Sequence, residues 1–409
     1  MHFPATRTAA LEKLNKFVPK SGRDYAAGRN FDLPDQDHPH VSKLSPYLRH
    51  RILTEHETLE AVLGRYALSS AEKFIQEVYW RTYWKGWLEL RPALWRDYRS
   101  DVKGALNRVQ TEAGLRAEFD AACAGETEIE CFNAWAQELV ETGYLHNHAR
   151  MWFASIWVFT LRLPWALGAD FFLRHLLDGD PASNTLSWRW VAGMQTKGKT
   201  YLARASNIEK YTEGRHRPAP YQLASEAVAL DSPPHPAIGP MPICGTWERG
   251  QDTALLLTED DLSPGFLFAQ GLTPSHTATL LTHGDRSPLV ISPNVATFTQ
   301  KAAADTLDRF KDKTGPTAAF EGAQSIPDVV AWAQTTGATQ IVTPYAPTGP
   351  AQEALDQLEY RLKPHNISLV RVLRDYDRAA WPYATHGFFK FKEKIPKLVG
   401  AIKGVKTVA

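Results

Sequence analysis

The pattern of apolar and polar positions divides the chain into two parts. Up to about residue 222 the apolar positions repeat with the period of an α-helix. Beyond residue 250 short β-rich runs alternate with amphipathic helices. The proline-rich segment between them has no periodicity, which is typical of a linker. We expect a helical domain over 1–222, a linker over 223–250, an α/β domain over 251–376 and a lysine-rich tail over 377–409.

Two helical segments carry a mixed polar and aromatic face. In 71–90 the spacing i, i+3, i+4, i+7 and i+11 holds Glu77, Trp80, Arg81, Trp84 and Leu88. In 145–161 the same spacing holds Asn147, Arg150, Met151, Ala154 and Val158. Such a face suits neither water nor an apolar core. It predicts a polar ligand cavity inside a helical bundle.

The second part predicts a doubly wound parallel sheet. Its β-rich runs lie at 253–258, 277–282, 317–321, 340–345 and 368–373. Amphipathic helices over 301–313 and 326–336 separate some of them and end at Gly315 and Gly337, where glycine caps are expected. Strands alternating with helices are typical of parallel α/β sheets. We therefore expect an all-α bundle followed by a five-stranded α/β domain.

Charge and cysteine content narrow the function classes. Lys and Arg number 46 and Asp and Glu 45, a net charge of +1, so that any nucleic-acid site must be a local patch. Three cysteines are too few for a disulfide framework or for the four ligands of an iron–sulfur cluster. We expect reduced cysteines, no metal site and a cytoplasmic protein.

Tryptophan content and apolar runs add two expectations. The most apolar stretch, 151–161, ends after 11 residues, whereas a membrane helix needs about 20. The first residues also lack the pattern of a secretory signal, so that we expect no membrane association. The chain has 13 tryptophans, most of them before residue 191. This suits a large core, stacking on flat ligands or electron transfer between rings.

Four motifs resemble those of one family. The stretch LLDGDPASNTLSWRWVAG at 176–193 resembles the flavin-binding signature of DNA photolyases and cryptochromes. The stretches SKLSPYL at 42–48, EVYWR at 77–81 and TGYLHNHARM at 142–151 also match that family, in its order. The second part resembles the α/β domain that photolyases usually carry at the N-terminus. The domain order therefore resembles a circular permutation.

The resemblance implies FAD as the cofactor, and a second, light-harvesting chromophore of unspecified identity. The implied FAD-lining residues are Tyr25, Ser42, Leu44, Ser45, Glu77, Arg81, Asn147, Arg150, Asp178, Asp180 and Asn184. A buried Arg and Asp side by side offset each other's desolvation, which agrees with this assignment. By themselves, Asp178 and Asp180 would also fit a turn or a helix N-cap.

The resemblance also implies a DNA substrate. Glu77, Trp80, Asn147, Met151 and Trp190 match positions that hold a flipped pyrimidine dimer, and stacking on indoles would offset base extrusion. Phosphate contacts would come from Arg81, Lys197, Lys199 and Arg204, although the last three also fit a solvated turn. His146 and His148 fit ordinary packing or a substrate contact.

Trp188 and Trp165 match the inner members of the family's electron-transfer chain. The outer tryptophan of that chain has no match. Either another ring such as Trp152 or Trp157 completes the path, or photoreduction of the flavin is slow.

Two functions follow from the resemblance. The first is a photolyase, a lyase that splits cyclobutane pyrimidine dimers in damaged DNA with an electron from light-excited reduced FAD. The alternative is a cryptochrome-type blue-light photoreceptor that repairs no DNA and acts through a signalling partner.

Overall fold

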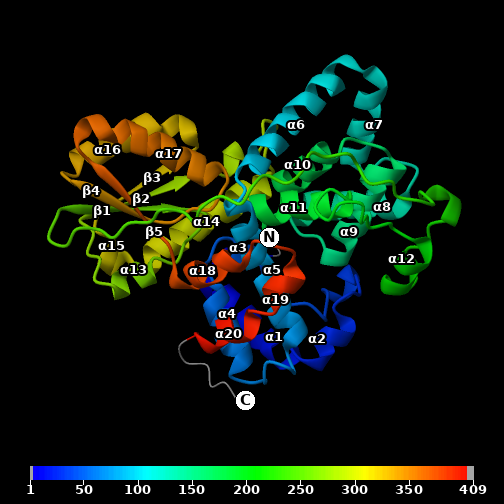
Figure 1. Ribbon diagram of the computed structural model, residues 1–409, viewed down its shortest axis with the longest axis horizontal. Helices are drawn as coiled ribbons and strands as arrows, with labels where there is room; N and C mark the ends of the chain where they lie inside the picture. Colours follow the sequence, from blue (N-terminus) through cyan, green and yellow to red (C-terminus); the bar gives the residue numbers. More distant parts are fainter. Residues whose placement is uncertain (1–2, 403–409) are drawn as a thin grey trace.

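The first part folds as a helical bundle, as its periodicity predicts. The computed structural model describes residues 3–402, and Figure 1 shows the bundle beside a separate sheet. Its helices are α1 (Arg7–Phe17), α2 (Arg23–Gly28), α3 (Ser45–Arg49), α4 (Glu55–Leu63), α5 (Glu72–Glu89), α6 (Ala93–Thr111), α7 (Ala113–Ala124), α8 (Glu130–Thr142), α9 (Asn147–Ser155), α10 (Trp165–His175), α11 (Pro181–Val191) and α12 (Ala205–Tyr211). The long helix α5 contacts α11, and α10 contacts both α6 and α11. The mixed face of 71–90 therefore lies on a central helix.

The helix predicted over 145–161 is shorter than expected. α9 begins at Asn147, where the His146 side chain accepts a hydrogen bond from the His148 amide. It passes at Ile156 into a π-helical turn that ends at Thr160. A wider turn of this kind often marks a functional site.

The second part forms the predicted five-stranded sheet. The strands are β1 (Thr253–Thr258), β2 (His276–Leu281), β3 (Thr317–Glu321), β4 (Gln340–Pro344) and β5 (Ser368–Val372). They are all parallel, in the order β3-β2-β1-β4-β5. The prediction of a doubly wound parallel sheet is confirmed.

Helices cover both faces of the sheet. They are α13 (Gly265–Ala269), α14 (Pro293–Arg309), α15 (Lys311–Thr314), α16 (Ile326–Thr335) and α17 (Pro350–Leu362). Side chains alternate along a strand, and so Leu255 and Leu257 of β1 join one core with α14, whereas Ala254 and Leu256 join another with α16 and α17. Gly315 has φ +61°, and a Cβ there would lie 2.2 Å from the Ser275 carbonyl oxygen. That position therefore requires glycine.

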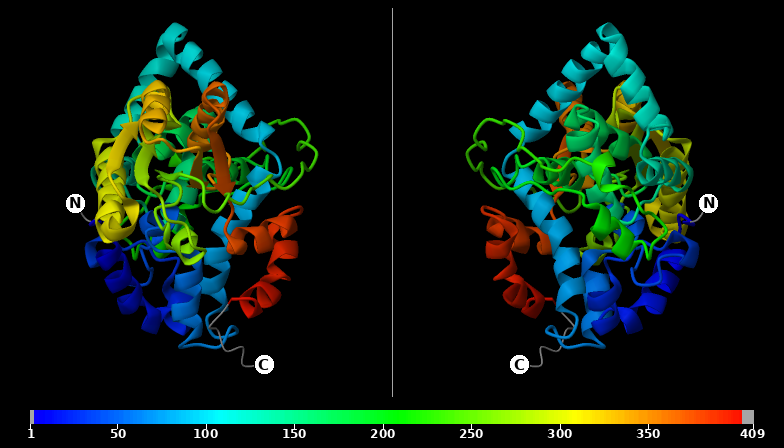
Figure 2. Two further views of the ribbon diagram at one scale, coloured as in Figure 1. Left: turned by 90° about the vertical axis from the view of Figure 1, so that its left-hand side faces the viewer. Right: turned by 90° about the vertical axis from the view of Figure 1, so that its right-hand side faces the viewer.

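The segment from 223 to 252 forms no helix or strand and crosses the molecule from the bundle to β1 (Figures 1 and 2). Backbone hydrogen bonds hold it at intervals. The amide of Leu230 donates to the Ala192 carbonyl, that of Gly239 to Leu90, and that of Gly245 to Arg371 in β5. The linker is thus tied first to the bundle and then to the sheet.

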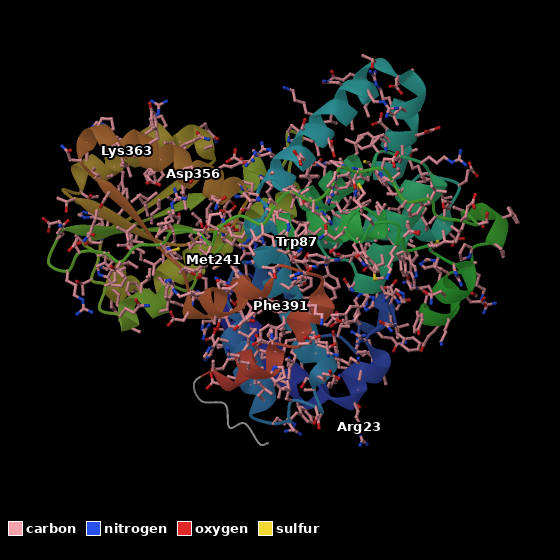
Figure 3. All side chains as sticks on the ribbon, viewed as in Figure 1. Arg23, Trp87, Met241, Asp356, Lys363 and Phe391 are labelled. Atoms are coloured by element: carbon pink, nitrogen blue, oxygen red, sulfur yellow. The ribbon has the colours of Figure 1, made fainter. Side chains whose placement is uncertain are left out.

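The chain returns to the bundle after β5. It forms α18 (Asp375–Ala380), α19 (Phe388–Lys392) and α20 (Ile395–Gly400), and Figure 2 shows this segment alongside α5. Phe391, labelled in Figure 3, packs against Tyr79 and Tyr83 of α5. The last lysines of the predicted tail, Lys403 and Lys406, lie outside the described residues.

A buried ion cluster joins the bundle, the sheet and the C-terminal segment. The Arg51 guanidinium is 2% exposed and lies 3.2 Å from Glu55, 3.3 Å from Asp261 and 2.7 Å from Asp377. Asp261 follows β1 and Asp377 lies in α18. Burial disfavours the Arg51 charge, but the three carboxylates hold its pKa well above the ordinary value. The cluster therefore fixes how these three parts dock.

Two features of the structure concern the cysteines and the apolar content of the helices. Cys123, Cys131 and Cys244 form no disulfide. Within residues 3–402, every helix is too short or too polar to cross a bilayer.

Candidate flavin and substrate site

The DGD motif forms the turn between α10 and α11. The Leu177 amide donates to the Gly143 carbonyl, which ties the turn to the start of the TGYLHNHARM motif. Asp180 caps α11 through a 2.7 Å hydrogen bond from the Ser183 amide, and Pro181 occupies the first helical position. Asp180 is therefore a helix N-cap as well as a residue of the DGD motif.

Asp178 pairs with Arg150, as the sequence predicted for adjacent FAD-lining residues. Arg150 Nη2 lies 3.0 Å from Asp178 Oδ2, and the side chains are 22% and 3% exposed. Burial would raise the pKa of Asp178, but the charges of Arg150 and Arg81 hold it below the ordinary value. Asp178 thus stays ionised and fixes the Arg150 guanidinium at the edge of the site.

Asp180 faces two cations of α5. Arg81 Nη1 lies 3.8 Å and Lys85 Nζ 3.7 Å from Asp180 Oδ2. Burial would raise the pKa of Asp180, but Lys85, Arg49 and Arg81 hold it well below the ordinary value. The mixed face of α5 is therefore turned toward the DGD motif.

Several buried polar atoms at this site have no hydrogen-bond partner within the described part of the chain. Buried atoms without a hydrogen-bond partner among the described residues include Arg81 Nη1, Lys85 Nζ, Asp178 Oδ1, Ser183 Oγ and Thr185 Oγ1. Unpartnered buried polar groups are costly, and in native proteins they point to a missing partner. This donor and acceptor set fits a ligand that carries phosphate and hydroxyl groups, as FAD does.

The SKLSPYL loop closes the same side of the site. The Ser42 hydroxyl accepts from the Leu44 amide at 3.3 Å, and Lys43 between them has φ +50°. Ser45 begins α3, and its side chain beside Asp178 helps to hold the Asp178 pKa below the ordinary value. Leu44 itself is buried. The loop thus joins the motif through Ser45.

On α5, Glu77 lies one helical turn before Arg81, and Trp80 lies directly before Arg81. Glu77 pairs with Arg29, which follows α2, and burial raises its pKa against the opposing charge of Arg29. Trp80 is half-buried, and Phe388 of α19 stacks on it with ring centroids 3.6 Å apart and planes at 12°. The stacked Phe388 covers one face of the indole. Tyr25 of α2 packs on Phe17 and Phe74.

The other residues predicted to contact a pyrimidine dimer come from α9 and α11. Asn147 is exposed and Met151 half-buried. Trp190 is half-buried too and packs against Tyr201 with ring centroids 5.9 Å apart. Asn184, one helical turn into α11, donates its amide N–H to the Ala169 carbonyl at 2.7 Å. α9 and α11 therefore supply residues of both predicted sets.

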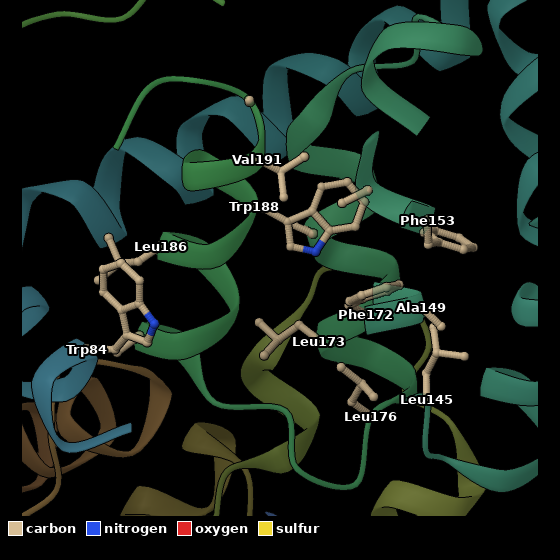
Figure 4. Close-up of a cluster of buried hydrophobic side chains, with 14 of the residues drawn as sticks. Trp84, Leu145, Ala149, Phe153, Phe172, Leu173, Leu176, Leu186, Trp188 and Val191 are labelled. Carbon is tan, nitrogen blue, oxygen red and sulfur yellow. The ribbon is translucent and has the colours of Figure 1, made fainter. Parts of the chain in front are cut away.

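Trp188 is buried on the side of α11 that packs against α10. Figure 4 shows its indole among Phe172, Val191 and Phe153. The ring packs on Gly168, where a Cβ would lie 2.4 Å from Trp188 Cη2. Trp165 begins α10, the helix that contains Gly168. The two tryptophans are thus held by the same pair of helices.

The other predicted residues lie outside this cluster. Lys197, Lys199 and Arg204 are exposed after α11, and Lys197 donates to the Ser232 carbonyl of the linker. His146 is buried, and this burial lowers its pKa to about 3. His148 is hydrogen-bonded to the Asn30 carbonyl and the Tyr201 hydroxyl. These contacts favour the packing interpretation of both histidines.

Sequence reasoning missed three cations. Lys85 lies four residues after Arg81 and could have been assigned to the same face of α5. Arg49 donates to the Gly179 carbonyl and pairs with Asp260 of the sheet domain. Arg286 comes from the turn after β2, and its Nη1 would lie 3.2 Å from a Cβ on Gly179. Arg49 directly follows the SKLSPYL motif and reaches Gly179 within the bundle, whereas only docking of the sheet domain brings Arg286 to the motif.

The helical part matches a known domain. The FAD binding domain of DNA photolyase matches residues 74–217. A deoxyribodipyrimidine photo-lyase of Synechococcus is 28% identical over 221 residues, which cover 50% of this chain and 42% of the relative. One of Streptomyces griseus is 35% identical over 157 residues, or 38% of this chain and 33% of the relative. The chain thus spans less than half the length of these curated relatives.

Solved structures show a similar partial match. The class III photolyase of Agrobacterium tumefaciens is 26% identical with a TM-score of 0.41, covering 50% of this chain and 42% of that one. A Synechocystis cryptochrome is 23% identical with a TM-score of 0.41, covering 50% and 43%.

Fold, site and family model together define a two-domain flavoprotein, with an FAD-binding helical domain and an all-parallel sheet domain. Its helical part, residues 74–217, matches the FAD binding domain of DNA photolyase, and about half of the chain is similar to deoxyribodipyrimidine photo-lyases.

The carboxylates of the site predict acid sensitivity. The pKa values of Asp178 and Asp180 are depressed below the unfolded value of 3.8. Their stabilisation is therefore fully present above that value and is lost as the pH falls through the folded-state values. We expect the free energy of unfolding, measured in urea, to fall below about pH 5. The Asp178→Asn variant should show a shallower fall, and an equal pH dependence in both proteins would contradict this assignment.

Proposed function

We propose that this chain is a DNA photolyase that splits cyclobutane pyrimidine dimers. The observation that carries the proposal is the arrangement on α5, where Glu77, Arg81 and Lys85 follow one another at about one turn and Trp80 lies directly before Arg81. One α-helical turn rises about 5.4 Å. A base stacked on Trp80 would therefore lie within one turn of a cofactor held by Arg81 and Asp180. Substrate and cofactor would be close enough for direct electron transfer.

The cofactor would be held by the pairs already described. Arg150 and the hydroxyls of Ser42 and Ser45 suit phosphate oxygens, and Asp178 and Asp180 suit hydroxyls. The amide of Asn184 would contact the flavin ring without fixing one redox state. When bound, reduced FAD supplies the electron on blue-light excitation.

The chain's own residues would bind and polarise the dimer. Stacking on Trp80 and Trp190 offsets the cost of extruding bases, at about 1–3 kcal/mol per stacked base. Phe388 stacks on one face of the Trp80 indole, so that a single face is left for the substrate. Glu77, whose pKa burial raises against the opposing charge of Arg29, would hydrogen-bond to a base. Lys197, Lys199 and Arg204 would contact phosphates of the flanking strand.

A repair assay tests the proposal. FAD-loaded, chemically reduced protein is incubated with a single-stranded oligonucleotide that contains one thymine dimer, under blue light. We expect light-dependent recovery of adjacent thymines, measured by chromatography. Trp80→Ala should bind this oligonucleotide about tenfold more weakly, since 1.4 kcal/mol is lost per factor of ten. Trp332→Phe, in α16 of the sheet domain, is the matched control and should bind as the wild type does.

Two outcomes would contradict the proposal. One is bound FAD that is photochemically active while no thymine is restored, which would favour the photoreceptor alternative. The other is equal binding of dimer-containing and undamaged oligonucleotides by the wild type.

We also propose the domain division 1–222, 223–250, 251–376 and 377–409, with an order permuted relative to photolyases. The strand order of the sheet domain and the long linker support it. A second chromophore would fit a cavity of about 360 Å³ where α5, the linker and the sheet meet. Its lining includes Glu89, Met241, Tyr345 and Arg371.

A further inference from the structure

The motif tryptophan Trp188 contacts the ring of one other tryptophan, and a second tryptophan begins the helix against which it packs. Trp157 lies 6.3 Å away between ring centroids. Trp165 lies on the helix against which Trp188 packs. Electrons move readily only between oxidisable rings that lie close together, and the surroundings of each tryptophan therefore decide which direction leads outward.

The Trp157 branch ends within the core. Trp157 is fully buried, and apart from Trp188 its ring neighbours in residues 3–402 are phenylalanines: Phe119, Phe132, Phe153 and Phe171. Phenylalanine is far harder to oxidise than tryptophan. Trp152, the other ring considered from the sequence, packs on Trp135 and His148 rather than on Trp188.

The Trp165 branch continues through two rings of α6. Tyr98 lies 5.8 Å from Trp165 between ring centroids, and Trp95 lies 5.3 Å from Tyr98. Burial raises the pKa of Tyr98 far above its ordinary value, and its hydroxyl has no partner among the described residues that could take a proton. The Tyr98 ring is therefore suited to bridging two tryptophans rather than to holding the oxidised state.

The outer end of this branch has a proton acceptor. Trp95 Nε1 donates a 2.9 Å hydrogen bond to Glu353 Oε1 of α17, in the sheet domain. Glu353 Oε2 accepts from Arg99 at 2.7 Å, and the Glu353 side chain is 40% exposed. An oxidised indole is a far stronger acid than a neutral one, so that a carboxylate at this distance would take its proton and pass it to water.

We propose that Trp165, Tyr98 and Trp95 continue the electron path from Trp188 toward the surface, with Glu353 accepting the proton of oxidised Trp95. This inference rests on the proposed function, since it takes the photoexcited flavin as the electron acceptor. The four rings belong to α11, α10 and α6 of the bundle, whereas the proton acceptor belongs to the sheet domain (Figure 1). Docking of the two domains thus completes the path.

Each step balances. With FAD bound, Trp188 would give one electron to the photoexcited flavin, Trp165 would give one to oxidised Trp188, and Trp95 would give one to oxidised Trp165 across Tyr98. Oxidised Trp95 then breaks its Nε1–H bond, and the proton passes to the Glu353 carboxylate, which leaves a neutral Trp95 radical. A thiol in solution returns one electron and one proton to Trp95, and two thiyl radicals join as a disulfide.

Flavin photoreduction and radical spectra test the path in the full-length, FAD-loaded protein with dithiothreitol as the thiol. We expect Trp95→Phe to slow photoreduction about tenfold, which corresponds to roughly 1.4 kcal/mol on the limiting barrier. Tyr98→Phe keeps the bridging ring, and Trp157→Phe changes the branch that ends in the core. Both should stay close to the wild-type rate. In Glu353→Gln the transient absorption spectrum should show a tryptophan radical cation that persists, where the wild type shows the neutral radical. Bound FAD should be unchanged in all four variants.

The controls separate this inference from the proposed function. A slow Trp188→Phe together with a wild-type rate in Trp95→Phe would overturn the path through Trp95 alone. A slow Trp157→Phe would place the path in the other branch and overturn it too. The repair assay uses chemically reduced protein and needs no photoreduction, so its failure would strike the proposed function independently.

Discussion

Asp178→Ala should bind FAD roughly 100-fold more weakly than the wild type, a loss of about 2.7 kcal/mol. The substitution leaves the Arg150 guanidinium without its 3.0 Å partner beside a motif that is otherwise buried. Removing one member of a buried ion pair costs about 3–5 kcal/mol. Arg150 stays 22% exposed and can draw on water, and the loss should therefore fall just below that range. Arg150 and the Ser45 hydroxyl would also lose their common anchor.

The measurement is the ratio of flavin to protein absorbance after reconstitution, together with a titration of apoprotein with FAD. Asp170→Ala is the matched control, because Asp170 is another buried aspartate paired with an arginine, Arg174, four residues away in α10. It should lower stability while the FAD content stays near that of the wild type. Normal FAD occupancy in Asp178→Ala would show that the DGD motif has been misassigned.

Arg51→Ala should be the most destabilising single substitution that we propose. It removes the cation that the buried carboxylates of Glu55, Asp261 and Asp377 share, of which, within residues 3–402, only Asp261 keeps another arginine, Arg374. The expected cost is about 3–5 kcal/mol or more, which is a large fraction of the 5–15 kcal/mol typical of a folded protein. The variant is therefore expected to fold poorly.

Arg51→Lys keeps the prediction testable if the alanine variant does not fold. A lysine keeps the charge but cannot span three carboxylates as the planar guanidinium does. Its free energy of unfolding in urea should lie between those of the wild type and Arg51→Ala. Arg108→Ala removes an exposed pair with Glu112 and should change stability little. A wild-type unfolding curve for Arg51→Lys would show that the cluster does not hold the domains together.

The sequence by itself determined the local elements. The β-rich runs became the five strands with bounds within one residue of those predicted, because hydrophobic burial of β1, β2 and β4 on both faces leaves a continuous apolar signature. The face of α5 was also set locally, since the spacing of Glu77, Trp80, Arg81 and Trp84 follows from helix geometry alone. The DGD turn and its pairing with Arg150 followed from motifs near each other in the chain.

Tertiary structure alone decided which residues distant in the sequence contact those motifs. Arg286 beside Gly179, Phe388 on Trp80 and Glu353 on Trp95 all come from the second half of the chain. Their places depend on how the domains dock, and docking is fixed by the Arg51 cluster and by shape rather than by periodicity. A pattern reports which side of a helix or strand is buried, but it carries no information about which distant surface does the burying. The faces of single helices and the turn of the DGD motif were therefore predictable, whereas the contacts between domains were not.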